Sequence, residues 1–245
     1  MNALDVEHIF KSFGETSVLE DLHFSVRQGE FVSILGPSGS GKSTLFHLIG
    51  GLMQPNSGDF HINGEKVTNK KGKISYMPQS PSLFPWRTVL KNVTLAAEIA
   101  GEDKEIEAIE MLNRAGLKGY ENVYPHELSG GMKQRVAFVR SLLSPQSIIC
   151  LDEPFSALDE FTRLDMQTWL IDLWQEQQKA ILFVTHNIDE AIFLSDRVIV
   201  LSNKPATVKK EFIIPFSRPR KPDLLLEEDF LACKKQIYAE LSESL

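Results

Sequence analysis

Residues 36–44 carry the clearest chemistry in the sequence, because they match the pattern G-x-x-x-x-G-K-[ST] that binds nucleotide phosphates. The glycines let the backbone curl, so that successive N–H groups point at phosphate oxygens. We predict that Lys42 reaches the β- and γ-phosphates and that the Ser43 hydroxyl ligates Mg²⁺, a hard cation that prefers oxygen. The residues expected to contact the nucleotide here are Gly36, Pro37, Ser38, Gly39, Ser40, Gly41, Lys42, Ser43 and Thr44.

The elements on either side of this segment are those that a phosphate-binding loop requires. The apolar run at residues 31–35 predicts a buried strand before the loop, and the run at 45–49 predicts a helix after it. A helix that begins at the loop adds the positive end of its dipole to the phosphate site. A flexible Gly/Ser turn is the alternative interpretation, but these flanking elements favour nucleotide binding.

Two adjacent carboxylates, Asp152 and Glu153, follow a second apolar run at residues 148–151, which predicts a buried parallel strand. In an α/β sheet, ligands bind beyond the carboxyl ends of the strands, so we expect these side chains beside the phosphate loop. We predict that Asp152 holds Mg²⁺ through water and that Glu153 polarises the attacking water. The alternative is a strand end kept soluble by acidic residues, and the phosphate loop favours the catalytic interpretation.

Two further stretches could contact phosphate. His186 ends the predicted strand at residues 180–185, where it could meet a γ-phosphate, although such a histidine is often only structural. Ser129, Gly130 and Gly131 open a predicted helix, with Ser129 in the capping position. The start of that helix could bind a second anion, and a simple turn is the alternative.

The composition is that of an ordinary globular protein. The chain has 245 residues, of which 42% are hydrophobic and 24% are charged. No run approaches the roughly 18 apolar residues of a membrane helix, and the first residues lack a signal-peptide pattern, so we expect a cytoplasmic protein. The net charge of −7 argues against broad nucleic-acid binding. Cys150 and Cys233 make no disulfide framework or metal cluster, and Cys150 is expected to be a buried thiol.

The rest of the sequence predicts a sheet domain with a helical insertion. Strands are expected at residues 6–10 and 18–26, a hairpin with an Asn-Gly turn at 60–67, and a strand at 74–77. Helices at 89–100 and 104–115 belong to a helical subdomain at about residues 80–143. Later elements are expected in the order helix 161–178, helix 188–194, strand 197–201, edge strand 208–214, linker 215–222 and helix 226–241.

Two sets of large apolar side chains have open roles. Phe13 lies in a predicted break between strands, where it could cap the sheet or stack on an adenine ring. Leu83, Phe84 and Trp86 lie in an irregular segment with prolines. They either pack within the helical subdomain or form a surface that binds a partner. The residue types alone leave both pairs of alternatives open.

In their order along the chain, these motifs resemble the ATP-binding subunit of ABC transporters. Residues 36–44 are identified as Walker A, Gln79 as the Q-loop glutamine, 128–132 as the signature and 148–152 as Walker B. The catalytic glutamate Glu153, the D-loop at 156–159 and the H-loop histidine His186 follow. The resemblance covers nearly the whole chain.

This resemblance implies an α/β fold, with a P-loop NTPase (RecA-like) core, an antiparallel β subdomain and the inserted α-helical subdomain. Residues 1–245 would form one ABC ATP-binding domain, ending in a short linker and helix at about 215–245. Met132 stands where the family usually has glutamine, and Phe13 where it usually has tyrosine. Neither departure removes a phosphate ligand.

The resemblance also implies a shared catalytic site. Two copies of the chain would sandwich two ATP molecules head to tail, so that Ser129, Gly130 and Gly131 of one copy face the γ-phosphate held by the other copy. It implies the following roles: catalytic Glu153, His186 and Gln79; Mg²⁺ ligands Ser43, Gln79 and Asp152; D-loop residue Asp159; and adenine-stacking Phe13.

The implied function is ATP hydrolysis that drives uptake of a small solute, at the cytoplasmic face of a membrane. The implied partners are integral-membrane permease subunits and, indirectly, an extracytoplasmic solute-binding protein, with no nucleic acid. Met132 and residues 83–86 and 186–191 resemble importers of nitrate, sulfonate, taurine and thiamine precursors. An exporter ATPase or a soluble non-transport ABC ATPase is the alternative. The sequence does not name the solute, because selectivity in such systems lies in the permease and the binding protein.

Overall fold

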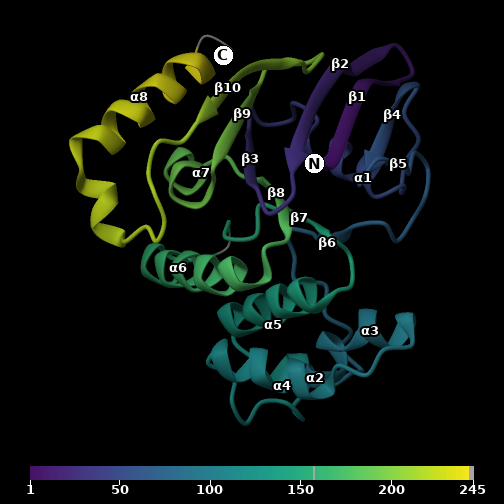
Figure 1. Cartoon of the computed structure of the whole chain (residues 1–245), viewed down its shortest axis with the longest axis vertical. Coiled ribbons are helices and arrows are strands. Elements are labelled where there is room, and N and C mark those ends of the chain that lie inside the picture. The colour runs from purple at the N-terminus through teal and green to yellow at the C-terminus, as the bar shows by residue number, and fades with distance from the viewer. Residues whose placement is uncertain (157, 243–245) are drawn as a thin grey trace.

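The computed structural model describes residues 1–156 and 158–242, which fold around two β-sheets (Figure 1). The larger sheet has the strand order β10-β9-β3-β8-β7-β6. Its neighbouring strands run parallel except for β10, which is antiparallel to β9 and forms one edge, as predicted. The strands span Phe31–Leu35 (β3), Ser75–Met77 (β6), Ile148–Asp152 (β7), Ala180–Val184 (β8), Arg197–Leu201 (β9) and Val208–Ile213 (β10). Every residue of β3, β7 and β8 is buried, which explains their continuous apolar sequences.

The smaller sheet is antiparallel, with the order β2-β1-β4-β5. Its strands span Asn2–Phe13 (β1), Thr16–Arg27 (β2), Ser57–Ile62 (β4) and Glu65–Lys66 (β5). β1 is longer than expected, so Phe13 ends a strand instead of lying in a wide break. Asn63 and Gly64 connect β4 to β5 with φ angles of 52° and 81°, which confirms the tight Asn-Gly turn.

The helices divide into those that flank the sheets and those of the helical subdomain, which lies at the opposite end of the molecule from β1, β2, β4 and β5 (Figure 1). The subdomain contains α2 (Val89–Val93), α3 (Leu95–Ala100), α4 (Glu105–Arg114), the 3₁₀ helix η1 (Pro125–Glu127) and α5 (Gly130–Leu143). The others are α1 (Lys42–Ile49), α6 (Glu160–Gln177), α7 (Ile188–Leu194), η2 (Pro222–Leu226) and α8 (Glu228–Ser242).

The helix predicted at residues 89–100 is divided at Thr94, which ends α2 and begins α3. The Thr94 hydroxyl donates to the carbonyl of Leu90 one turn earlier, a contact that bends helices. The buried Asn92 side chain donates to three carbonyls of the preceding loop, those of Phe84, Arg87 and Thr88. The irregular segment is therefore anchored to α2 by a polar side chain.

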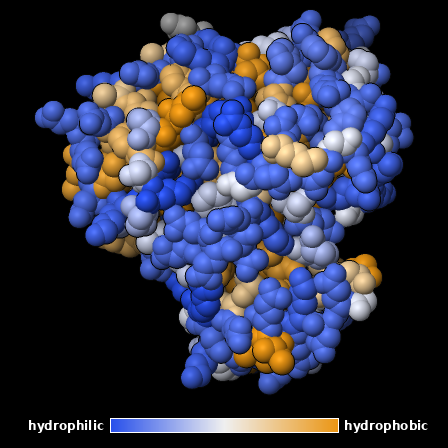
Figure 2. Space-filling model, viewed as in Figure 1, coloured by the Kyte–Doolittle hydropathy of each residue, from blue (hydrophilic) through white to orange (hydrophobic). Residues whose placement is uncertain are grey.

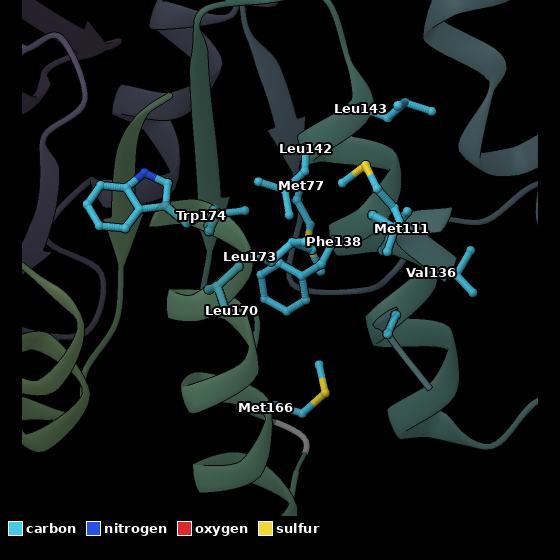
Figure 3. Close-up of a cluster of buried hydrophobic side chains, with 14 of the residues drawn as sticks. Met77, Met111, Val136, Phe138, Leu142, Leu143, Met166, Leu170, Leu173 and Trp174 are labelled. Atoms are coloured by element: carbon cyan, nitrogen blue, oxygen red, sulfur yellow. The ribbon is translucent and has the colours of Figure 1, made fainter. Parts of the chain in front are cut away.

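A hydrophobic core joins the larger sheet to α5 and α6. Phe138 of α5 stacks on Phe155, with ring centroids 5.3 Å apart. Leu170 and Trp174 of α6 are buried in the same cluster. Figure 3 shows side chains of α5 and α6 converging on this core. This packing fixes Phe155, which follows Asp152 closely in the chain, against the core below the sheet.

The surface is largely polar on the face shown in Figure 2, and hydrophobic side chains gather there in small separate groups. One such group lies on the lower end, which the helical subdomain forms (Figures 1 and 2). Among the described residues, no helix is long and apolar enough to cross a membrane.

Candidate active site

A cavity of about 690 Å³ collects predicted site residues from four distant parts of the chain. It lies at the carboxyl ends of β3, β7 and β8, where the phosphate loop, the catalytic carboxylates and His186 were expected to meet. The lining residues are Phe13, Val18, Ser38, Gly39, Gly41, Lys42, Ser43, Thr44, Glu153, His186 and Lys204.

The phosphate loop connects buried β3 directly to α1. Gly41 has φ 106°, and a Cβ placed there would lie 2.8 Å from Cγ1 of Val18, so both the backbone and the packing require glycine. Lys42 begins α1, and its Nζ donates to the carbonyls of Gly36 at 2.9 Å and Pro37 at 2.8 Å. Burial lowers the pKa of Lys42, while the nearby Glu153 and Asp152 carboxylates act in the opposite direction. The ammonium group is thus held over the loop.

Asp152 ends β7 beside the phosphate loop. Its Oδ2 accepts a hydrogen bond from the Tyr76 hydroxyl at 3.2 Å. Burial raises the pKa of Asp152, and the nearby hydroxyls of Ser43 and Tyr76 oppose that shift. A serine hydroxyl near a carboxylate offers oxygen donors of the kind that Mg²⁺ prefers, so the residues present fit this cation.

Glu153 follows Asp152 with φ 45°, a left-handed conformation that is uncommon for glutamate. Its backbone N–H donates to the carbonyl of Val184 at 2.9 Å, which ties this conformation to the end of β8. The Glu153 Oε2 lies 3.2 Å from Nδ1 of His186. The two side chains that were predicted from separate strand ends therefore meet at one edge of the cavity.

Gln79 and Asp159 lie outside the residues that line the cavity. The Gln79 Nε2 donates to Oγ of Ser156 at 3.1 Å, which joins the segment after β6 to the segment after Glu153. Asp159 is the N-cap of α6, and its Oδ1 accepts from the N–H of Thr162 at 3.0 Å. Ala157, between Ser156 and α6, is outside the described residues.

The glycine-rich start of α5 does not line the cavity of its own chain. Ser129 is the N-cap, as predicted, and its Oγ accepts from the N–H of Met132 at 3.3 Å. A Cβ at Gly130 would meet nothing within 4 Å, and one at Gly131 would only touch Thr162 at 3.6 Å. Neither glycine has a positive φ. Packing within the described chain therefore gives no reason for glycine at these two positions.

Sequence reasoning missed three residues at this site. Tyr76 contacts Asp152 because β6 pairs with β7, and Val18 lies against Gly41 because β2 of the smaller sheet passes the phosphate loop; no local pattern reveals either. Lys204 follows β9 in a stretch typical of a polar turn, yet it lines the cavity. The only signal in the sequence was that Lys204 lies a few residues after the end of β9.

The structure places the other apolar and thiol residues of interest as follows. Phe13 lines the cavity with 47% of its surface exposed, and Nζ of Lys11 lies 5.0 Å from its ring centroid. Leu83 packs against the core, whereas Trp86 is 72% exposed. Cys150 is buried as expected, and burial raises the pKa of its thiol.

Comparison with known proteins decides the family. Residues 19–156 match the family described as ABC transporter. The chain belongs to this family. It is 42% identical to the formylaminopyrimidine import ATP-binding protein ThiZ of Halalkalibacterium halodurans, over 98% of this chain and 96% of that protein. It is also 42% identical to the aliphatic sulfonates import ATP-binding protein SsuB of Bacillus anthracis, over 87% and 85% of the two chains. The nitrate import ATP-binding protein NrtD of Synechocystis sp. is 43% identical, over 82% and 77%.

Solved structures agree with this assignment. A bacterial ABC transporter cassette solved as a dimer has a TM-score of 0.74 and 34% identity, covering 87% of this chain and all of the other. The same cassette, bound to ADP and Pi, was described as a post-hydrolysis state with the same scores. Another ATP-binding subunit of an ABC transporter has a TM-score of 0.78 and 27% identity. The predicted P-loop ATPase fold and the predicted class, an ATP-hydrolysing subunit of an ABC importer, are confirmed.

Proposed function

We propose that this subunit binds Mg²⁺ and ATP in the described cavity and uses hydrolysis to drive a membrane permease that imports a small solute. The observation that carries the site assignment is the contact between Glu153 and His186 at the mouth of the phosphate loop. ATP hydrolysis needs a positioned water, a held γ-phosphate and charge stabilisation, and this edge of the sheet offers a group for each.

The phosphates fit the loop in the following way. Backbone N–H groups of the loop and the α1 dipole bind the phosphate oxygens, and the Lys42 ammonium neutralises the β- and γ-phosphates. Phe13, which also lines the cavity, offers the adenine ring a partly exposed aromatic side chain. Lys204, also in the lining, adds a second positive charge near a polyanionic ligand.

Mg²⁺ would be held by Ser43 and Asp152, whose hydroxyl and carboxylate lie near each other. Gln79 uses its amide nitrogen on Ser156, which leaves its carbonyl oxygen as the atom to offer the cation. When bound, the cation would offset charge on the β- and γ-phosphate oxygens.

Glu153 is the proposed acceptor for the attacking water. Its carboxylate accepts a hydrogen bond from that water and orients one oxygen lone pair toward the γ-phosphorus. His186, 3.2 Å away, fixes the carboxylate and offers its ring to the γ-phosphate. Phosphoryl transfer needs mainly positioning and electrostatic stabilisation. In this proposal Glu153 and His186 provide the positioning and Lys42 provides positive charge, and all three come from one chain.

The remaining charge stabilisation is proposed to come from a second copy of the chain. Packing among the described residues gives no reason for glycine at Gly130 and Gly131, which begin α5, and a helix N-terminus can bind an anion. A phosphate that approaches from another subunit would require their small size. The dimeric solved cassette supports a dimer. In the proposed dimer the two copies lie head to tail, so that Ser129 would face the partner's ATP.

The exposed aromatic segment is the proposed contact with the permease. Trp86 is 72% exposed, and its ring lies 5.2 Å from that of Phe84. The segment begins soon after Gln79, so a permease bound there would be joined to the ATP site through the Gln79–Ser156 hydrogen bond. This contact would place the chain at the cytoplasmic face of the membrane as a peripheral subunit.

The solute is proposed to be small and either anionic or heterocyclic. The curated relatives are named for import of formylaminopyrimidine, aliphatic sulfonates and nitrate. Selection of the solute belongs to the permease and to an extracytoplasmic binding protein, because the described cavity of this chain is built for a nucleotide.

The test is to purify the chain with the membrane proteins that co-isolate with it and to measure ATP turnover as candidate solutes and binding proteins are added. Stimulation by one solute together with its binding protein supports the proposal and identifies the cargo. A stable ATPase that co-isolates with no membrane protein, or with a nucleic acid, would contradict it.

A further inference from the structure

Glu190 is a carboxylate in an unusual place, because it lies inside the protein on α7. Only 7% of its side chain is exposed, and buried glutamates are rare unless they are paired. Burial raises the pKa of this carboxyl, while the Thr185 hydroxyl and Arg163 oppose the shift. The site chemistry described above makes no use of Glu190.

One oxygen of Glu190 is bound to the loop that carries His186. Oε2 accepts a hydrogen bond from the Thr185 hydroxyl at 2.5 Å. The same hydroxyl accepts from the N–H of Asn187 at 3.0 Å. Both neighbours of His186 are therefore linked to this carboxylate through one side chain.

The other oxygen faces the segment that leads into α6. Oε1 of Glu190 lies 3.6 Å from Nε of Arg163, and Nη2 of Arg163 donates to the carbonyl of Leu158 at 2.8 Å. Leu158 lies beside Asp159, the N-cap of α6, in the segment whose Ser156 accepts the hydrogen bond from Gln79. Two segments that are 27 positions apart in sequence, at Leu158 and Thr185, are thus joined through one ion pair.

We propose that Glu190 is a positioning residue that, through Arg163, holds the His186 loop in register with the segment preceding α6. The inference rests on the proposed role of His186. Glu190 is not proposed to contact the nucleotide or the attacking water. A buried ion pair is weak evidence for stability, because an apolar pair of similar volume often stabilises as well. The fixed geometry of the guanidinium group suits it to hold two loops at a set distance.

The first experiment replaces the charge and keeps the shape. In Glu190→Gln the side-chain oxygen still accepts from Thr185, but the charge that faces Arg163 is lost. We expect kcat for ATP to fall by about 10- to 100-fold, the loss typical of a small misplacement of catalytic groups. The KM for ATP, the nucleotide Kd and the melting temperature should stay near those of the wild type. If Glu190 only stabilised the fold, the melting temperature would fall instead.

Asp189→Asn is the matched control, because Asp189 is the neighbouring acid on α7 but pairs with Lys234 of α8 instead of Thr185 or Arg163. This variant should keep the wild-type kcat. Arg163→Met should reproduce the kcat loss of Glu190→Gln, and the double variant should be no slower than either single variant.

The deciding comparison uses His186→Ala. If Glu190 acts through His186, Glu190→Gln should cause no further loss of kcat in the His186→Ala background. An equal loss in both backgrounds, or a wild-type kcat for Glu190→Gln beside an impaired His186→Ala, would overturn this proposal alone. A wild-type kcat for His186→Ala would overturn the proposed role of His186 and the positioning role together.

Discussion

Glu153 shows how backbone geometry at one residue prepares a reaction. Its left-handed φ of 45° costs free energy, which the hydrogen bond from its N–H to Val184 and the pairing of β7 with β8 offset. The result is a carboxylate directed at the cavity and at His186 instead of along the strand.

We expect Glu153→Gln to retain ATP binding and to lose turnover by at least about 100-fold, because the amide has the same shape but cannot serve as a base. Steady-state hydrolysis and the Kd of a fluorescent ATP analogue measure the two effects. With hydrolysis blocked, ATP should hold the variant in a closed dimer, which light scattering detects. Wild-type turnover in this variant would remove Glu153 from the mechanism.

Lys42→Ala should weaken ATP binding itself, by about 10- to 100-fold, because charge-assisted hydrogen bonds to phosphate are lost. The same fluorescence titration measures this Kd. Lys91→Ala is the control, since Lys91 is an exposed lysine on α2 far from the loop in sequence. Equal affinity for ATP in the Lys42 variant and the wild type would refute the assigned role.

At the residue scale, the sequence predicted those site residues whose chemistry is local. Lys42, Glu153 and His186 stand directly at strand or loop ends, and the structure brings them to one cavity. Tyr76 and Lys204 were missed, because their places depend on which strands are neighbours and not on the residues beside them.

At the element scale, the buried strands were predictable, because parallel strands covered on both faces have continuous apolar sequences. The division of the 89–100 helix was not, since it arises from the Thr94 hydroxyl and from bonds of Asn92 to a loop several residues earlier. Polar side chains that bond to backbone outside their own turn leave no periodic signal.

Helix α6 carries the Asp159 cap, so its docking on the sheet should matter for stability. Leu170→Ala should lower the free energy of unfolding by about 2–5 kcal/mol, because Leu170 is fully buried and its removal leaves a cavity. Phe161→Ala on the same helix should change it by less than about 0.5 kcal/mol, since Phe161 is 89% exposed. Denaturant unfolding measures both, and equal losses would contradict the described packing.

At the scale of the whole molecule, the proposed ATP site and the proposed permease contact belong to different parts of the fold. The proposed ATP cavity lies at the strand ends of the larger sheet, and the helical subdomain, which contains Trp86, lies away from the smaller sheet (Figure 1). The order β10-β9-β3-β8-β7-β6 could not be derived from spacing alone, because several orders are compatible with the same alternation of strands and helices.

Trp86→Ala tests the connection between these two parts. We expect the isolated chain to keep its ATP turnover, and the reconstituted complex to lose the stimulation by solute, because the contact with the permease is weakened. Tyr120→Ala, a change at another exposed aromatic residue of the subdomain, should leave the stimulation intact. Normal transport by the Trp86 variant would remove the proposed interface.

The central claim is that one chain holds an incomplete site, which a second copy completes through Ser129, Gly130 and Gly131. The most direct test is ATP turnover per chain at saturating Mg²⁺ and ATP, measured over about a 100-fold range of chain concentration. A composite site predicts that turnover per chain falls on dilution as dimers dissociate, and that Ser129→Arg abolishes turnover while ATP still binds. Turnover per chain that stays constant on dilution, with a Ser129→Arg variant as active as the wild type, would contradict the account.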